Sequence, residues 1–186
     1  NDDVLYICYD NEAYMNTGIQ KSSLTPFGAS TTTTPAGARE HGCLTSKKSL
    51  FDIVAAHGIP YAATASVGYL SDFLKKVERA RDVRGCRFIH VVAPCPVGWG
   101  FPSEDMVDVA KEVVDTGLWY LAEYKGPALS GVPGGAFRLN RNPRAFKPIE
   151  PYLRRQGRFR ADDEADLAAI EAARDERWAY MRERWA

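Results

Sequence analysis

Residues 4–9, Val-Leu-Tyr-Ile-Cys-Tyr, form a short apolar run that ends directly in Asp10 and Asn11. This pattern predicts a buried strand whose carboxyl end carries polar side chains, and in open α/β sheets that edge is where cofactors bind. The side-chain oxygen of Asn11 and the carbonyls after it are hard, neutral ligands that suit a Mg²⁺ held together with a diphosphate. For the Asp-Asn pair alone, an Asx turn at the end of a strand is the simpler interpretation.

Strand and helix patterns alternate over the first 125 residues. Amphipathic helices are predicted at 47–57, 70–83 and 103–115, and further strands at 61–65, 87–93 and 119–124. Ser46 and Ser103 are expected to cap the first and third of these helices. Such alternation predicts a parallel sheet with right-handed crossovers, in which we expect the strand at 4–9 to be central.

The remaining residues have a different character. Residues 126–160 are rich in Gly and Pro, and the part from Arg138 to Arg160 is strongly basic. Subunit contacts or docking of an acidic electron carrier would use such a segment. A long helix is predicted over Asp162–Trp185, with acids at its start and arginines at its end as the macrodipole favours. Its apolar residues are too few for a buried helix, so we expect it to pack on one side or against another subunit.

The composition is that of a globular domain, with 45% apolar and 26% charged residues. The formal net charge is zero, so no overall field favours nucleic acid or acidic lipid as a partner. No run of 18 apolar residues occurs, and we expect no membrane association. The four cysteines lack the spacing of a disulfide scaffold, which is typical of a reducing, cytoplasmic location.

The loop that follows Asn11 runs to Pro35 with hardly any helical or strand pattern. Long structureless loops in compact domains are usually functional or disordered. Tyr14, Met15 and Phe27 argue against disorder, because a solvated linker rarely carries so many apolar side chains.

Three segments carry a resemblance to a known family. Residues 9–35 closely resemble the thiamine-diphosphate loop in the β subunits of multi-subunit 2-oxoacid:ferredoxin oxidoreductases, which include pyruvate synthase. Residues 93–99, Ala-Pro-Cys-Pro-Val-Gly-Trp, and the segment 151–159 continue it. The family normally carries a Gly-Asp-Gly turn well before the residue that matches Asn11. Only ten residues precede Asn11 here, and we therefore expect a C-terminal fragment of a longer β subunit.

The resemblance implies a fold and an activity. The fold would be the C-terminal part of a parallel-sheet thiamine-diphosphate-binding domain over residues 1–125, and residues 126–186 would be an extension for subunit contacts. The activity would be oxidative decarboxylation of a 2-oxoacid, pyruvate first, to acyl-CoA and CO₂. Electrons would pass through a 4Fe-4S cluster to ferredoxin, and other subunits of the complex would be partners.

The resemblance also assigns site residues. Asn11 through its side chain and Ala13 through its carbonyl would bind Mg²⁺. Tyr14, Asn16, Thr17 and Gly18 would complete the binding of thiamine diphosphate, with Asn16 also facing the reacting centre as a catalytic residue.

Cys95 lies just after a predicted strand and between two prolines. A single cysteine in an apolar context is more often an inert core residue. The resemblance makes Cys95 a ligand of the iron–sulfur cluster, whose ligands can come from distant parts of a sequence. Cys8 and His90, inside predicted strands, are expected to be core residues.

Two other classes of function stay open. A different thiamine-diphosphate-dependent decarboxylase would explain the loop after Asn11 but not the segment around Cys95. A non-enzymatic interaction domain would use the basic segment as its binding surface. Nucleic acid is a poor candidate for that partner, because the segment lacks a pattern of stacking aromatic residues.

Overall fold

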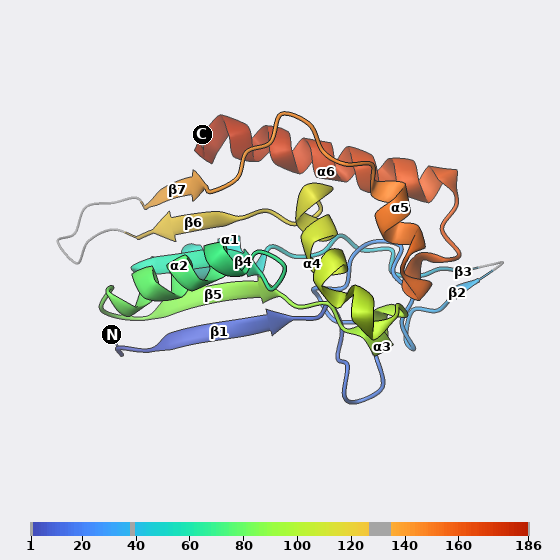
Figure 1. Cartoon of the computed structure of the whole chain (residues 1–186), viewed down its shortest axis with the longest axis horizontal. Coiled ribbons are helices and arrows are strands. Elements are labelled where there is room, and N and C mark those ends of the chain that lie inside the picture. The colour runs from blue at the N-terminus through green and yellow to red at the C-terminus, as the bar shows by residue number, and fades with distance from the viewer. Residues whose placement is uncertain (1, 38–39, 127–134, 186) are drawn as a thin grey trace.

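The computed structural model describes residues 2–37, 40–126 and 135–185. At its centre is a five-stranded sheet in the order β1-β5-β4-β6-β7 (Figure 1). Its strands are β1 Leu5–Asp10, β4 Tyr61–Ser66, β5 Arg87–Val92, β6 Ala122–Lys125 and β7 Ala136–Leu139. A separate two-stranded sheet consists of β2 Ala36–Gly37 and β3 Glu40–His41.

The predicted α/β class is confirmed, but the sheet is mixed. Strands β1, β5 and β4 are parallel, whereas β6 is antiparallel to β4 and β7 is antiparallel to β6. The expectation of an all-parallel sheet is therefore wrong for β6 and β7. The helix before β6 lies at the carboxyl end of the parallel strands instead of along the sheet, so the chain enters β6 from that end and runs back (Figure 1). In the described part of the chain, β1 is an edge strand with Tyr6 and Tyr9 exposed, so the expectation of a buried, central strand at 4–9 is not met there.

Two helices cover opposite faces of the parallel strands. The helix α1, Leu50–Ala55, packs through Phe51 with Ala62 of β4, and α2, Leu70–Arg81, packs through Ala80 with Ala63. Neighbouring residues of a strand point to opposite faces, which explains this division. All six residues of β4 and all six of β5 are buried, as expected for strands covered on both sides.

The helix caps differ from those predicted. Helix α1 begins later than expected because the Ser49 hydroxyl, not that of Ser46, accepts the N–H of Asp52. Ser103 does not cap a helix either. It opens a 3₁₀ turn, η1 Ser103–Asp105, which continues into α4, Met106–Asp115.

Several short elements were not predicted from the sequence. They are α3 Pro96–Trp99, α5 Ile149–Arg154 and the 3₁₀ turn η2 Gly157–Phe159. Helices α3 and α5 have four and six residues, too few to show an apolar period. They enclose a third packing region together with α4, built around Trp99, Val109 and Leu153.

The long helix α6, Glu164–Trp185, packs on one side as predicted. Trp178, Met181 and Trp185 are buried in the cluster that also contains Phe51 and β6 residues. The helix lies along the β6–β7 side of the molecule (Figure 1). Since β7 belongs to the same sheet as β1, the segment after residue 126 contributes to the central sheet; the division into domains at residue 125 stays a prediction.

The carboxyl ends of β1 and β5 bring the two segments of interest together. Asp10 is in register with Val92, and the Ala93 N–H donates to the Asp10 carbonyl at 2.9 Å. Asn11 and Cys95, which are far apart in sequence, therefore leave the sheet side by side.

Candidate functional site

The turn of residues 11–13, here called the Asn11 turn, presents free oxygen atoms at the edge of the sheet. The Asn11 side chain is half-buried and makes no hydrogen bond within the described residues, and the same holds for the Ala13 carbonyl. The Asn11 carbonyl, by contrast, accepts the indole N–H of Trp99 at 2.8 Å. An amide oxygen and a carbonyl oxygen that lack protein partners fit the neutral ligand positions of a Mg²⁺.

A buried network of charges lies directly behind this turn. Lys47 Nζ is 2.6 Å from Asp10 Oδ2 and 2.6 Å from Glu12 Oε1, and Arg158 Nη2 is 2.6 Å from Glu12 Oε2. His90 Nε2 lies 2.9 Å from Asp10 Oδ2. Buried charges are stable only when paired in this way, and removing one member of such a pair typically costs several kcal/mol.

The charge states in this network follow from burial and pairing. Burial by itself raises the pKa of Asp10, but the Lys47 ammonium and the hydrogen bond from His90 outweigh it and hold the pKa well below its ordinary value. Burial lowers the pKa of His90 despite its contact with Asp10. The imidazole is therefore neutral at pH 7 and donates through Nε2 to an ionised carboxylate. This confirms His90 as a satisfied core residue.

Apart from the burial of His90, this network was not predicted from the sequence. Lys47 and Arg158 lie far from Asp10 in the chain, and although Arg158 lies in the segment 151–159, nothing in that segment indicates that it pairs with Glu12. The one available signal was the Asp10-Asn11-Glu12 run, since two acids at the end of a strand that is predicted to be buried would need cationic partners.

The residues after Ala13 form a compact loop of their own. The backbones of Tyr14 and Gln20 pair as an antiparallel bridge, and the Thr17 hydroxyl donates to Gln20 Oε1 at 2.6 Å. The Thr32 hydroxyl donates to the Gly18 carbonyl at 2.7 Å and closes the loop from the other side. Gly18 has φ +118°, which favours glycine. Asn16, Thr17 and Gly18 are exposed, so a ligand can reach them.

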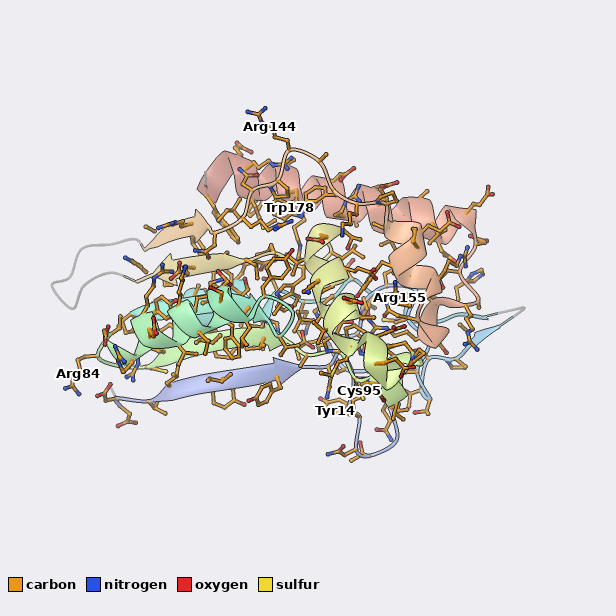
Figure 2. The ribbon with its side chains drawn as sticks, viewed as in Figure 1. Tyr14, Arg84, Cys95, Arg144, Arg155 and Trp178 are labelled. Atoms are coloured by element: carbon orange, nitrogen blue, oxygen red, sulfur yellow. The ribbon has the colours of Figure 1, made fainter. Side chains whose placement is uncertain are left out.

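Residues 93–99, here called the Cys95 turn, lie against this loop. Cys95 is the N-cap of α3, and its Sγ accepts the Gly98 N–H at 3.4 Å. A Cβ on Gly98 would lie 2.2 Å from Met15 Sδ, so a larger residue at this position would have to displace the Met15 side chain. Figure 2 shows Tyr14 and Cys95 at the same end of the molecule, whereas Arg144 points away on the α6 side.

The structure thus brings all the predicted site residues to one end of the sheet. Cys95 can supply one thiolate, and within residues 2–37, 40–126 and 135–185 no three His, Cys, Asp or Glu side chains are arranged to hold a metal ion. Cys8 is half-buried, and burial raises the pKa of its thiol, as expected for a core residue. No helix in the described part of the chain is long and apolar enough to span a membrane.

Many cations of the basic segment have partners within the molecule. Arg141 and Lys147 pair with Asp115, and Arg155 pairs with Glu112. A role of this segment in docking another protein stays a prediction.

Comparison with known proteins gives consistent matches. Residues 1–91 match the family of the C-terminal thiamine pyrophosphate-binding domain of thiamine pyrophosphate enzymes. The chain is 48% identical over 168 residues to the pyruvate synthase subunit PorB of Methanothermobacter marburgensis. The aligned region covers 90% of the chain and 56% of that protein. It is 45% identical over 175 residues to PorB of Methanocaldococcus jannaschii, covering 94% of the chain and 56% of the relative.

A second group of relatives is named after a different substrate. The ketoisovalerate oxidoreductase subunit VorB of Pyrococcus abyssi is 45% identical over 182 residues, covering 97% of the chain and 56% of that protein. The chain thus spans about half the length of the relatives it matches. Over that length, the chain is homologous to the PorB and VorB subunits.

Proposed function

We propose that the chain is the thiamine-diphosphate-binding part of the catalytic subunit of a 2-oxoacid:ferredoxin oxidoreductase in the cytoplasm. The observation that carries the proposal is the contact between the Asn11 turn and the Cys95 turn at the carboxyl ends of β1 and β5. A cofactor on the first turn and a cluster bound at the second would lie next to each other. This arrangement favours an oxidoreductase over a non-oxidative decarboxylase, which has no use for the Cys95 turn.

Different residues of the chain would bind Mg²⁺, the diphosphate and the substrate. Asn11 Oδ1 and the Ala13 carbonyl would hold Mg²⁺, and Thr17 with the Gly18 backbone would lie against the diphosphate. Tyr14 would form part of the rim, and its exposed ring leaves it free to do so. Asn16 would donate its amide N–H to charge that develops on the substrate. Bound thiamine diphosphate would supply the carbanion that attacks a 2-oxo carbon.

Cys95 would bind one iron of a 4Fe-4S cluster, and the electrons would leave through that cluster to ferredoxin. Coenzyme A would accept the acyl group, and other subunits would complete the pocket. Pyruvate is the first expectation for the substrate, although similar identity to PorB and VorB relatives keeps branched-chain 2-oxoacids as candidates.

The test of this proposal is Asn11→Leu in the assembled enzyme. Leucine has the same branched skeleton but no oxygen, so Mg²⁺ would lose a ligand that no neighbouring side chain replaces. We expect most bound thiamine diphosphate to be lost, as measured by cofactor content after gel filtration. Ala13→Gly is the matched control, since it keeps the carbonyl and should retain most of the cofactor.

Normal cofactor content in Asn11→Leu would contradict the assignment. Iron content of the same preparations separates the two enzyme classes, because a non-oxidative decarboxylase needs no cluster at Cys95.

A further inference from the structure

The Asn11 turn has a backbone conformation that needs support. Glu12 has φ +66°, the left-handed region that non-glycine residues rarely adopt, and the residue is buried. This backbone conformation costs about 1 to 3 kcal/mol and persists only where the surrounding structure fixes it. Two hydrogen bonds fix the backbone of Glu12. Its N–H donates to Asp10 Oδ1 at 2.9 Å, and its carbonyl accepts the Thr25 hydroxyl at 2.6 Å.

The side chain of Glu12 is held from both sides. Lys47 pairs with one carboxylate oxygen and Arg158 with the other, each at 2.6 Å. Arg158 comes from η2, which is far from the turn in sequence. Its side chain is 6% exposed, so water does little to weaken the pair.

The same arginine also contacts the Cys95 turn. The Arg158 guanidinium lies 3.7 Å from the centre of the Trp99 ring, and Trp99 has no exposed surface. Trp99 is the last residue of the helix that Cys95 caps, and it donates its N–H to the Asn11 carbonyl. Arg158 and Trp99 thereby connect the Asn11 turn, the Cys95 turn and η2 through direct contacts.

We propose that Trp99 and Arg158 are positioning residues, which fix the Asn11 turn in place relative to the Cys95 turn. The Trp99 N–H orients the Asn11 peptide, and the Asn11 side chain makes no hydrogen bond within the described residues. Arg158 holds Trp99 and Glu12 together. The inference rests on the proposed function, since it takes the Asn11 turn as the site of Mg²⁺ and diphosphate.

The first test is Trp99→Phe in the assembled enzyme, because phenylalanine keeps a ring beneath Arg158 and removes only the N–H donor. Trp119→Phe is the matched control. Trp119 is also buried, and its N–H has no hydrogen-bond partner within the described residues. Hydrogen exchange of the peptide covering residues 9–18, measured without cofactor, should become at least about threefold faster in Trp99→Phe and stay unchanged in the control.

Cofactor binding gives a second measurement on the same pair of variants. The apparent Kd of thiamine diphosphate in the presence of Mg²⁺ should rise about three- to tenfold in Trp99→Phe, the range expected for one lost hydrogen bond. Turnover at saturating cofactor should recover to at least half of the wild-type value, because a positioning residue does not contact the reacting atoms. Equal behaviour of the two Trp→Phe variants would overturn the proposal.

Arg158→Lys keeps the charge next to Glu12 but loses the stacking on Trp99. We expect it to speed exchange in the same peptide, whereas Arg174→Lys, at another buried and paired arginine, should not. This second pair of variants tests the positioning role even if Trp99→Phe fails to fold. If exchange responds as expected but Asn11→Leu keeps its cofactor, the positioning stands and the proposed ligand is wrong.

Discussion

Asp162 is a buried carboxylate without the partners that the other buried acids have. Only 4% of the residue is exposed, and neither side-chain oxygen has a hydrogen-bond partner within the described residues. Burial, with Asp166 and Asp163 nearby, raises the pKa of Asp162 to about 7, although Arg154 and His41 act in the opposite direction. The carboxyl is therefore partly protonated at neutral pH.

This raised pKa predicts a pH-dependent loss of stability. The folded state holds the Asp162 proton more tightly than the unfolded state, so its contribution to stability falls as pH rises from about 4 to about 7. Asp162→Asn should remove this dependence and be more stable than the wild type at pH 8 by on the order of 2 kcal/mol. Urea unfolding at several pH values measures the difference.

The exposed Asp163 provides the control for this experiment. Asp163→Asn keeps the cap of α6, since an asparagine oxygen can still accept the N–H groups of Ala165 and Asp166. Its effect on stability should be smaller than that of Asp162→Asn, because it removes only one of the charges near Asp162 and leaves that carboxyl in place. A stability difference between Asp162→Asn and the wild type that does not change between pH 4 and 8 would contradict the assignment.

At the residue scale, we expect substitutions of Cys95 and Cys8 to have different effects. Cys95→Ala in the assembled enzyme should leave the fold and cofactor binding largely intact and abolish reduction of ferredoxin, since its thiolate would be a cluster ligand. Cys8→Ala should cost only packing, about 1 kcal/mol. Iron analysis and a ferredoxin reduction assay measure both. Full iron content and normal reduction in Cys95→Ala would exclude the electron-transfer role.

At the scale of the element, α6 depends on a few large side chains. Met181 is 1% exposed and packs in the cluster that includes Trp178 and Trp185. The Trp178 indole also donates to the Gly117 carbonyl at 2.8 Å, which fixes the helix to the end of α4. The rest of the helix surface is mostly exposed, so these contacts should dominate its stability.

Met181→Ala should therefore destabilise the chain by about 3 kcal/mol, within the usual range for buried Met→Ala changes. Glu176→Ala, on the exposed surface of the same helix, should change stability by less than about 0.5 kcal/mol. Urea unfolding measured by circular dichroism compares the two. Similar values for both variants would mean that α6 is not anchored through its apolar residues.

On the scale of the whole molecule, the sheet is what makes a single site out of separate segments. Parallel pairing of β1 with β5 places the residues after Asp10 and after Val92 at one edge. The segment around Arg158 reaches the same edge through α5 and η2, which pack on α4 and α3. The antiparallel strands β6 and β7 extend the sheet beyond β4, on the side opposite β1, and α6 packs against them.

The sequence by itself determined the parallel β1, β5 and β4, the helices between them and the long final helix. Their signals are local, because burial repeats with the period of a strand or helix within one segment. The residues 11–18 and 93–99 could also be identified from the sequence, since each is a contiguous motif next to a strand.

Only the tertiary structure decided the direction of β6, the cap at Ser49 and the buried network of Lys47, Glu12 and Arg158. Strand direction depends on where the preceding helix packs, and a cap depends on which of several serines reaches a free N–H. A charge network joins residues that are far apart in sequence, and no local pattern tells which cation will meet which acid. The partners of Glu12 follow from the fold, because burial makes pairing necessary and only three-dimensional proximity selects the pair.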